Sequence, residues 1–178
     1  MIKYNDILSE YTYQDETEIV ERIQNLNICG EREARDIINS IVLWKVNRQV
    51  NIGMDLFCRI REFNLTDARD LNKREPEIRE IVHLLLQVKG VRIAMASTFL
   101  KMFYPDVFPI IDQRAYRELY GEELPKSMKI HDAVELYLTY IYDCHRYYNE
   151  NCLGQIAFSD LDKVLYQLDI NKGNRVSY

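Results

Sequence analysis

The turn around Gly90 contains residue types that suit the binding of a phosphate group. Apolar helical segments are predicted on both sides of residues 89–92, KGVR, so the connection between them is a tight turn. Glycine allows a positive φ or a close backbone approach. The first backbone N–H groups of the second helix, from Arg92 to Ala94, would face outward with the positive end of the helix dipole. That arrangement predicts a phosphate site, although an ordinary helical hairpin turned by one glycine explains the same spacing.

Asp112 is the second residue placed where it could do chemistry. Residues 105–111, PDVFPII, hold two prolines and end in β-branched residues, which favours an extended connector rather than a helix. A helix is predicted to begin directly afterwards, at Gln113. An aspartate in that place is a good N-cap, because its carboxylate accepts hydrogen bonds from the free N–H groups of the first turn. Position alone therefore favours a capping role for Asp112.

The segment 85–119 resembles the helix-hairpin-helix DNA glycosylase superfamily. The hairpin pattern of that superfamily is apolar, two of any type, apolar, any, Gly, apolar, Gly, three of any type, Ala. This chain matches it at Leu85, Val88, Gly90, Val91 and Ala96, and has Arg92 in place of the second glycine. In the superfamily an extended segment after the hairpin ends in a catalytic aspartate, and residues 108–114, FPIIDQR, have that form.

The resemblance implies that Asp112 is catalytic. Breaking an N-glycosidic bond develops positive charge on the sugar, and a nearby carboxylate can stabilise that charge while orienting water. The resemblance also implies that the turn binds DNA, through Lys89, Gly90, Val91, Arg92 and Ala94. Bifunctional members carry a Schiff-base lysine at the position of Ala94, so we expect base release without strand cleavage. Besides Arg92, Gln113 departs from the superfamily, which usually has a small or β-branched residue there.

A base pocket is the least specific part of the resemblance. Trp44, Lys45 and Arg48 lie on a predicted helix that the resemblance places near a cleft between two lobes, where tryptophan could stack on an extruded base. A core tryptophan with two solvated basic neighbours explains the same residues. The four cysteines are scattered without a CxxC pair and the three histidines are dispersed, so we expect no metal, no iron–sulfur cluster and no cofactor.

The elements that must position these residues are predicted to be helices. Apolar residues recur at helical spacing through most of the chain, and Gly and Pro lie between the periodic segments. We expect an all-α, compact, two-lobed fold in one domain over residues 1–178, with the hairpin motif at 84–100. Pro76 is expected at the start of its helix, where proline is well tolerated. The predicted helices span residues 16–25, 31–47, 54–63, 76–88, 92–103, 113–120, 130–149 and 159–168.

The composition excludes a membrane-spanning protein and a disordered one, and it does not decide whether the partner is nucleic acid. Hydrophobic residues make up 47% and charged residues 29% of the 178 residues, and neither a signal peptide nor a membrane span is present. We therefore expect a cytoplasmic protein. The net charge of −5 argues mildly against nucleic acid. Locally, however, residues 73–101 contain six basic and three acidic side chains, a net +3 that predicts a basic face able to hold a phosphate.

Taken together, the residues and the resemblance favour a monofunctional DNA glycosylase that acts on a modified base in duplex DNA. Two alternatives remain open. One is a nucleic-acid-binding protein that keeps the hairpin and lacks the chemistry. The other is a helical protein-interaction module, which the acidic net charge and the missing second glycine favour.

Overall fold

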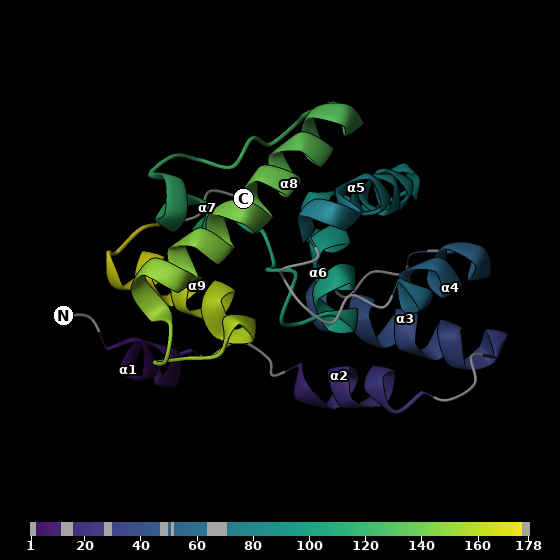
Figure 1. Cartoon of the computed structure of the whole chain (residues 1–178), viewed down its shortest axis with the longest axis horizontal. Helices are drawn as coiled ribbons and strands as arrows, with labels where there is room; N and C mark the ends of the chain where they lie inside the picture. The colour runs from purple at the N-terminus through teal and green to yellow at the C-terminus, as the bar shows by residue number, and fades with distance from the viewer. Residues whose placement is uncertain are drawn as a thin grey trace.

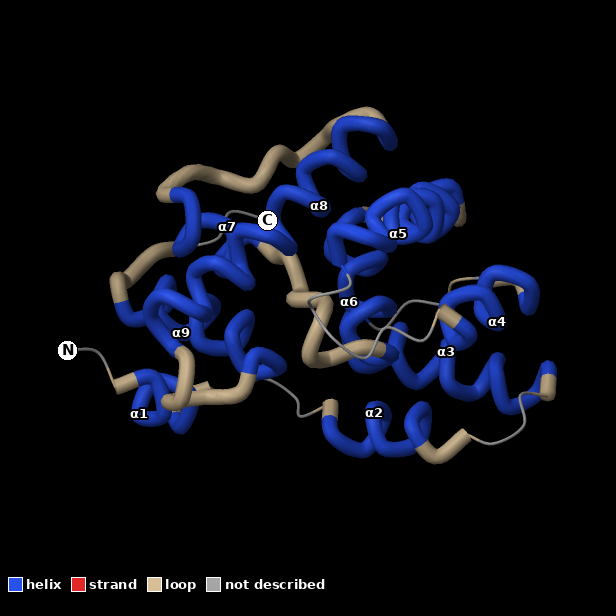
Figure 2. The backbone as a smooth tube through the Cα atoms, in the orientation of Figure 1, coloured by secondary structure: helices blue, strands red, loops and turns tan. Residues whose placement is uncertain are grey.

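The structure is a computed structural model in which residues 3–11, 16–26, 30–46, 50, 52–63 and 71–175 are described. Over these ranges the regular structure is helical, without strands (Figure 2). The α-helices are α1 (Tyr4–Ser9), α2 (Thr17–Gln24), α3 (Glu31–Val46), α4 (Met54–Glu62), α5 (Leu71–Gln87), α6 (Ile93–Phe103), α7 (Gln113–Tyr120), α8 (Ile130–Tyr147) and α9 (Leu161–Asn171). A π-helical turn (Tyr148–Cys152) follows α8, and a 3-10 turn (Phe158–Asp160) precedes α9.

The all-α prediction is confirmed, and most of the predicted helices lie within a few residues of the observed ones. The expected helix start at Pro76 is wrong, because α5 begins at Leu71 and contains the proline in its second turn. Proline there removes the hydrogen bond that residue 76 would donate to the carbonyl of Asn72. Leu71 is buried in the core, and this burial favours the additional helical turn. The short helix α1 was not predicted.

Helix α6 lies at the centre of the molecule, with α2, α3, α4, α5 and α8 packed around it (Figure 1). A helix surrounded in this way is expected to be mainly apolar and buried on all sides. Residues 95–103 of α6 are indeed all buried. In the part of the chain that the structure describes, no helix is both long and apolar enough to cross a membrane.

A second group of helices forms the other side of the molecule. Helix α9 packs against α7 and α1, which brings the first and the last helix of the described chain side by side (Figure 1). Helix α8 contacts α5 and α6 of the first group, and its Tyr147 and Asp143 form hydrogen bonds with Tyr4 of α1 and Tyr120 of α7, so it connects the two groups. One hydrophobic cluster extends through both groups, from Tyr4 to Leu168. Trp44, Lys45 and Asp112 lie where the two groups meet.

Candidate functional site

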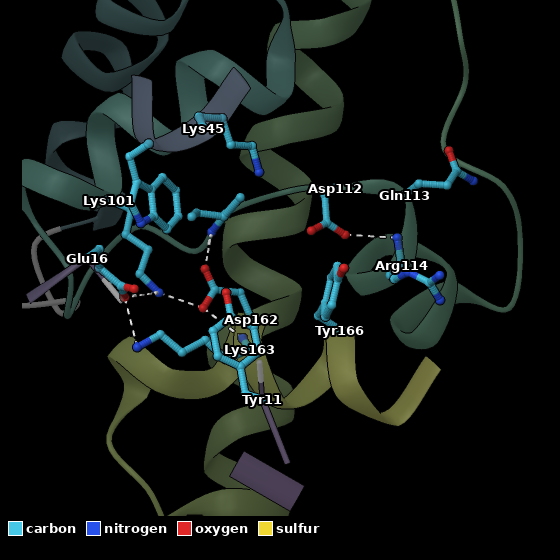
Figure 3. A pocket seen from close by; sticks show the side chains of 12 residues that line it. Tyr11, Glu16, Lys45, Lys101, Asp112, Gln113, Arg114, Asp162, Lys163 and Tyr166 are labelled. Carbon is cyan, nitrogen blue, oxygen red and sulfur yellow. Dashed lines mark hydrogen bonds and ion pairs between the residues drawn. The ribbon is translucent and has the colours of Figure 1, made fainter. Parts of the chain in front are cut away.

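A cavity of about 270 Å³ lies between the two groups of helices. Its walls come from α3, α6, α7 and α9, from the connector before α7, and from the chain around the start of α2. The residues that line it are Tyr11, Glu16, Trp44, Lys45, Lys101, Ile110, Asp112, Gln113, Arg114, Asp162, Lys163 and Tyr166 (Figure 3). Aromatic side chains and charged groups of both signs therefore line one pocket.

Asp112 caps α7 and also lines the cavity. Its Oδ1 accepts hydrogen bonds from the backbone N–H groups of Arg114 and Ala115, both at 2.8 Å. Its Oδ2 takes part in neither bond, and Figure 3 shows the carboxylate directed into the cavity, with the amine of Lys45 pointing toward it from the facing wall. The predicted N-cap is thus present, and one carboxylate oxygen remains available for another partner.

Burial raises the pKa of the Asp112 carboxyl above its ordinary value. The charge of Lys45 and the hydrogen bonds from Ala115 and Arg114 act in the opposite direction, and the charge of Asp162 adds to the increase. The environment therefore combines a low-dielectric surrounding with a nearby cation, which is the kind of setting in which a carboxylate can interact strongly with a developing positive charge.

The connector that carries Asp112 is fixed by side chains from three helices. The carbonyl of Pro109 accepts from the Tyr137 hydroxyl at 3.0 Å, and the carbonyl of Ile110 accepts from the Tyr140 hydroxyl at 3.1 Å. The N–H of Ile110 donates to Asp162 Oδ2 at 2.8 Å. The N–H of Ile111 donates to the hydroxyl of the buried Ser97 of α6 at 3.2 Å. An extended segment usually pairs its backbone groups with a neighbouring strand, and here these buried side-chain bonds take that role. They hold the connector, and with it Asp112, in one position.

A buried ion pair supports the same connector. Lys101 of α6 is 1% exposed, and its Nζ donates to Asp162 Oδ1 and to the carbonyl of Ser159, both at 2.5 Å. Asp162 thereby connects Lys101 to Ile110 (Figure 3). The prediction that Lys101 contributes to an exposed basic face is wrong. Because α6 is buried on all sides, a lysine in this helix requires a buried counter-charge.

The turn between α5 and α6 has the predicted geometry. Gly90 has φ +88°, and the N–H of Val91 donates to the carbonyl of Val88 at 3.0 Å, which closes the turn. Val91 and Ala96 are buried between the helices, whereas Lys89, Gly90 and Arg92 are exposed and Ala94 is half-buried. Arg92 is the N-cap residue of α6 without a side-chain capping bond. The turn does not line the cavity. The turn lies at the N-terminal end of α6, whereas the cavity contacts α6 near its C-terminal end, at Lys101.

The residues predicted for a base pocket are partly brought together. Trp44 and Lys45 line the cavity beside Asp112, and Trp44 is 8% exposed, so it belongs to the core and to the cavity wall at once. Arg48 lies outside the described residues. Sequence reasoning did not find Glu16, Tyr11, Asp162, Lys163 or Tyr166 as members of the site. No local pattern in the sequence marks these side chains as neighbours.

Among the described residues, no cluster of three or more His, Cys, Asp and Glu side chains is arranged to hold a metal ion. Comparison of the chain with protein-family models, curated proteins and solved structures gives no match.

Proposed function

We propose that the protein is a monofunctional DNA glycosylase, which binds duplex DNA through the turn at Gly90 and hydrolyses the N-glycosidic bond of a modified base held in the cavity. The observation that carries this proposal is the position of Asp112. Its carboxylate is fixed by two backbone hydrogen bonds through Oδ1, while the carboxylate as a whole faces a cavity lined by aromatic residues. The two groups of helices on either side of the cavity would be the two lobes of a helix-hairpin-helix fold.

In this mechanism Asp112 acts on the sugar and the aromatic walls act on the base. An extruded base gains stacking contacts from rings such as Trp44, in exchange for the stacking it loses in the duplex. As the glycosidic bond breaks, the sugar becomes positively charged, and the nearby carboxylate stabilises this charge. The same carboxylate can accept a hydrogen bond from the attacking water and so orient it. Ala94 offers no amine, so the product is an abasic site in an intact strand.

The turn at Gly90 would hold the DNA backbone. Lys89 and Arg92 are exposed on either side of it, and the first N–H groups of α6 have no acceptors within the helix. A phosphate placed there gains hydrogen bonds and the favourable end of the helix dipole. This contact is independent of base sequence, so it positions the duplex and leaves the choice of base to the cavity.

A panel of duplexes tests the proposal. Each duplex carries one modified base, and the strands are analysed with and without alkali after incubation with the protein. We expect alkali-labile sites in at least one duplex and intact strands before alkali treatment. Duplex affinity should also decrease steeply with added salt, because phosphate contacts release counterions. A covalent adduct trapped by borohydride would contradict the monofunctional assignment and would direct attention to Lys45.

The capping bonds of Asp112 also favour a second candidate function. Two backbone hydrogen bonds are enough to explain an aspartate at the start of α7 without any chemistry. The protein would then bind nucleic acid through the turn and release no base. Duplex binding with no base release from any member of the panel would support this second function.

The first prediction concerns the turn. In Gly90→Val a β-branched residue must adopt φ +88°, which is strained even though its Cβ would meet only Val50 at an ordinary 3.7 Å. The turn should distort, and loss of phosphate hydrogen bonds should weaken duplex binding about tenfold or more, as measured by fluorescence anisotropy. Gly121→Val is the matched control, since Gly121 has φ +75° and open space around it but lies at the end of α7. Equal losses of affinity in both variants would contradict the role of the turn.

The second prediction concerns pH. If the reaction needs ionised Asp112, base release should increase with pH through the raised pKa of Asp112 and reach a plateau above it. The acidic limb should lie above the usual pKa of an exposed aspartate, about 3.9.

The folded state holds this proton more tightly than the unfolded state. The resulting stabilisation is therefore present below the unfolded pKa and is lost as pH rises through the folded pKa. Single-turnover rates and urea unfolding across pH, compared between the parent and Asp112→Asn, measure both effects.

A further inference from the structure

The end of the cavity away from Asp112 contains an acceptor that lacks a donor. Glu16 lies next to the start of α2, its side chain is 8% exposed, and its Oε1 accepts from Lys163 Nζ at 2.9 Å (Figure 3). Its Oε2 is buried without a hydrogen-bond partner. Buried carboxylate oxygens are rarely left in this state because the loss of hydration is not compensated. A donor from a ligand in the cavity would complete the hydrogen bonding of this carboxylate.

A donor with spare capacity lies beside that acceptor. Lys163 Nζ contacts Glu16 at 2.9 Å and Asp160 at 3.2 Å, and an ammonium group has three N–H donors. Burial alone would lower the pKa of Lys163, but the hydrogen bonds and charges of these carboxylates raise it, so this side chain remains an ammonium. Besides these two carboxylates, Lys163 Nζ lies 5.8 Å from the centroid of the Tyr11 ring, so its third N–H can turn to a ligand acceptor next to Glu16.

The other polar groups at this end are already engaged with each other. Asp162 accepts from Lys101, from the backbone N–H of Lys163 and from that of Ile110. Lys101 donates to Asp162 and to a backbone carbonyl, and its Nζ lies 4.0 Å from Glu16 Oε1. The pattern offered to a ligand is therefore one acceptor, on Glu16, beside one donor, on Lys163.

We propose that Glu16 and Lys163 recognise a base with a lactam edge, in which a single ring N–H lies next to a carbonyl group. The N–H donates to Glu16, and the carbonyl accepts from Lys163. An amino group such as that of adenine would bring two N–H donors to one open acceptor and leave one of them unpaired. Glu16 Oε2 is covered in the structure, and a partial rotation of the carboxylate about its terminal bond, which has a broad torsional minimum, would bring it to the ligand. This inference rests on the proposed function and adds the class of base to it.

The duplex panel gives the first test. Duplexes with uracil or hypoxanthine, which have a lactam edge, should lose their base at least about tenfold faster than duplexes with 3-methyladenine or 1,N6-ethenoadenine, which lack one. Faster release of the adenine-type bases would overturn the inference and leave the glycosylase proposal standing. This comparison uses the unchanged protein, so it does not depend on the folding of any variant.

Glu16→Gln gives the second test. The amide oxygen can still accept from Lys163, but its NH₂ group would then face the N–H of the base, donor against donor. Release of uracil and hypoxanthine should slow by about tenfold to a hundredfold, in line with the loss of a hydrogen bond to a charged group. Glu18→Gln, an exposed change in the first turn of α2, is the control and should be without effect. Unchanged rates in Glu16→Gln would overturn the inference.

Free bases separate this inference from the proposed function. Millimolar hypoxanthine or uracil should raise the Tm of the parent and of Asp112→Asn, because ligand binding stabilises the folded state, and should not raise that of Glu16→Gln. Adenine should give a smaller shift. If no duplex loses a base, the glycosylase proposal fails and these shifts alone decide the inference. No shift with any base, or an equal shift with adenine, would overturn it.

Discussion

Base release should fall at least about a hundredfold when Asp112 is replaced by asparagine. The change removes the charge that would stabilise the developing cation, and the loss of such a group typically removes several kcal/mol from the stabilisation of the transition state. The amide oxygen of the introduced asparagine can still accept from the N–H groups of Arg114 and Ala115, so the free energy of unfolding should change by about 1 kcal/mol or less. Single-turnover rates with the best duplex measure the first effect, and urea unfolding measures the second.

Two controls make this experiment specific. Asp132→Asn changes an exposed carboxylate in the first turn of α8 and should leave the rate unchanged. Asp112→Ala should lose the charge and the cap together, with an additional cost in stability of about 0.5–2 kcal/mol. Duplex affinity should be retained in Asp112→Asn, because the turn at Gly90 is separate from the cavity. If Asp112→Asn released the base at the same rate as the parent, Asp112 would be only a helix cap.

The largest loss of stability is expected for Lys101→Met. Methionine fits the volume of the lysine stem, but Asp162 would remain in the core without its cation. Removing one member of a buried ion pair costs about 3–5 kcal/mol. The same change at the exposed Lys89 should alter the free energy of unfolding by less than about 0.5 kcal/mol. Urea unfolding monitored by circular dichroism gives both values.

The double variant Lys101→Met/Asp162→Asn tests the reason for that loss. Asparagine removes the unpaired charge and keeps an oxygen that can accept from the N–H of Ile110. It should therefore be more stable than Lys101→Met alone, since replacing both members of a buried pair often costs little. If the double variant were as unstable as the single one, packing of the lysine stem rather than the charge would account for the effect.

Much of the fold could be derived from local patterns. The period of the apolar residues predicts the helices, and Gly90 and the two prolines of the connector locate the interruptions, because side-chain sterics and backbone hydrogen bonding act over a few residues. The N-cap at Asp112 is equally local, since it depends only on the backbone N–H groups of the next turn. These features could be predicted without knowing how the helices pack.

Tertiary structure decided what lies around those elements. Pro76 lies inside α5 because the burial of Leu71 extends the helix beyond the point where proline would start it. Lys101 has the same charge as Lys89, but it is buried because α6 is covered on all sides. Its partner Asp162 is 61 residues away in the chain. Periodicity identifies which face of a helix is apolar but not which helix covers it, so the meeting of Glu16, Lys163 and Asp112 in one cavity depends on packing between distant segments.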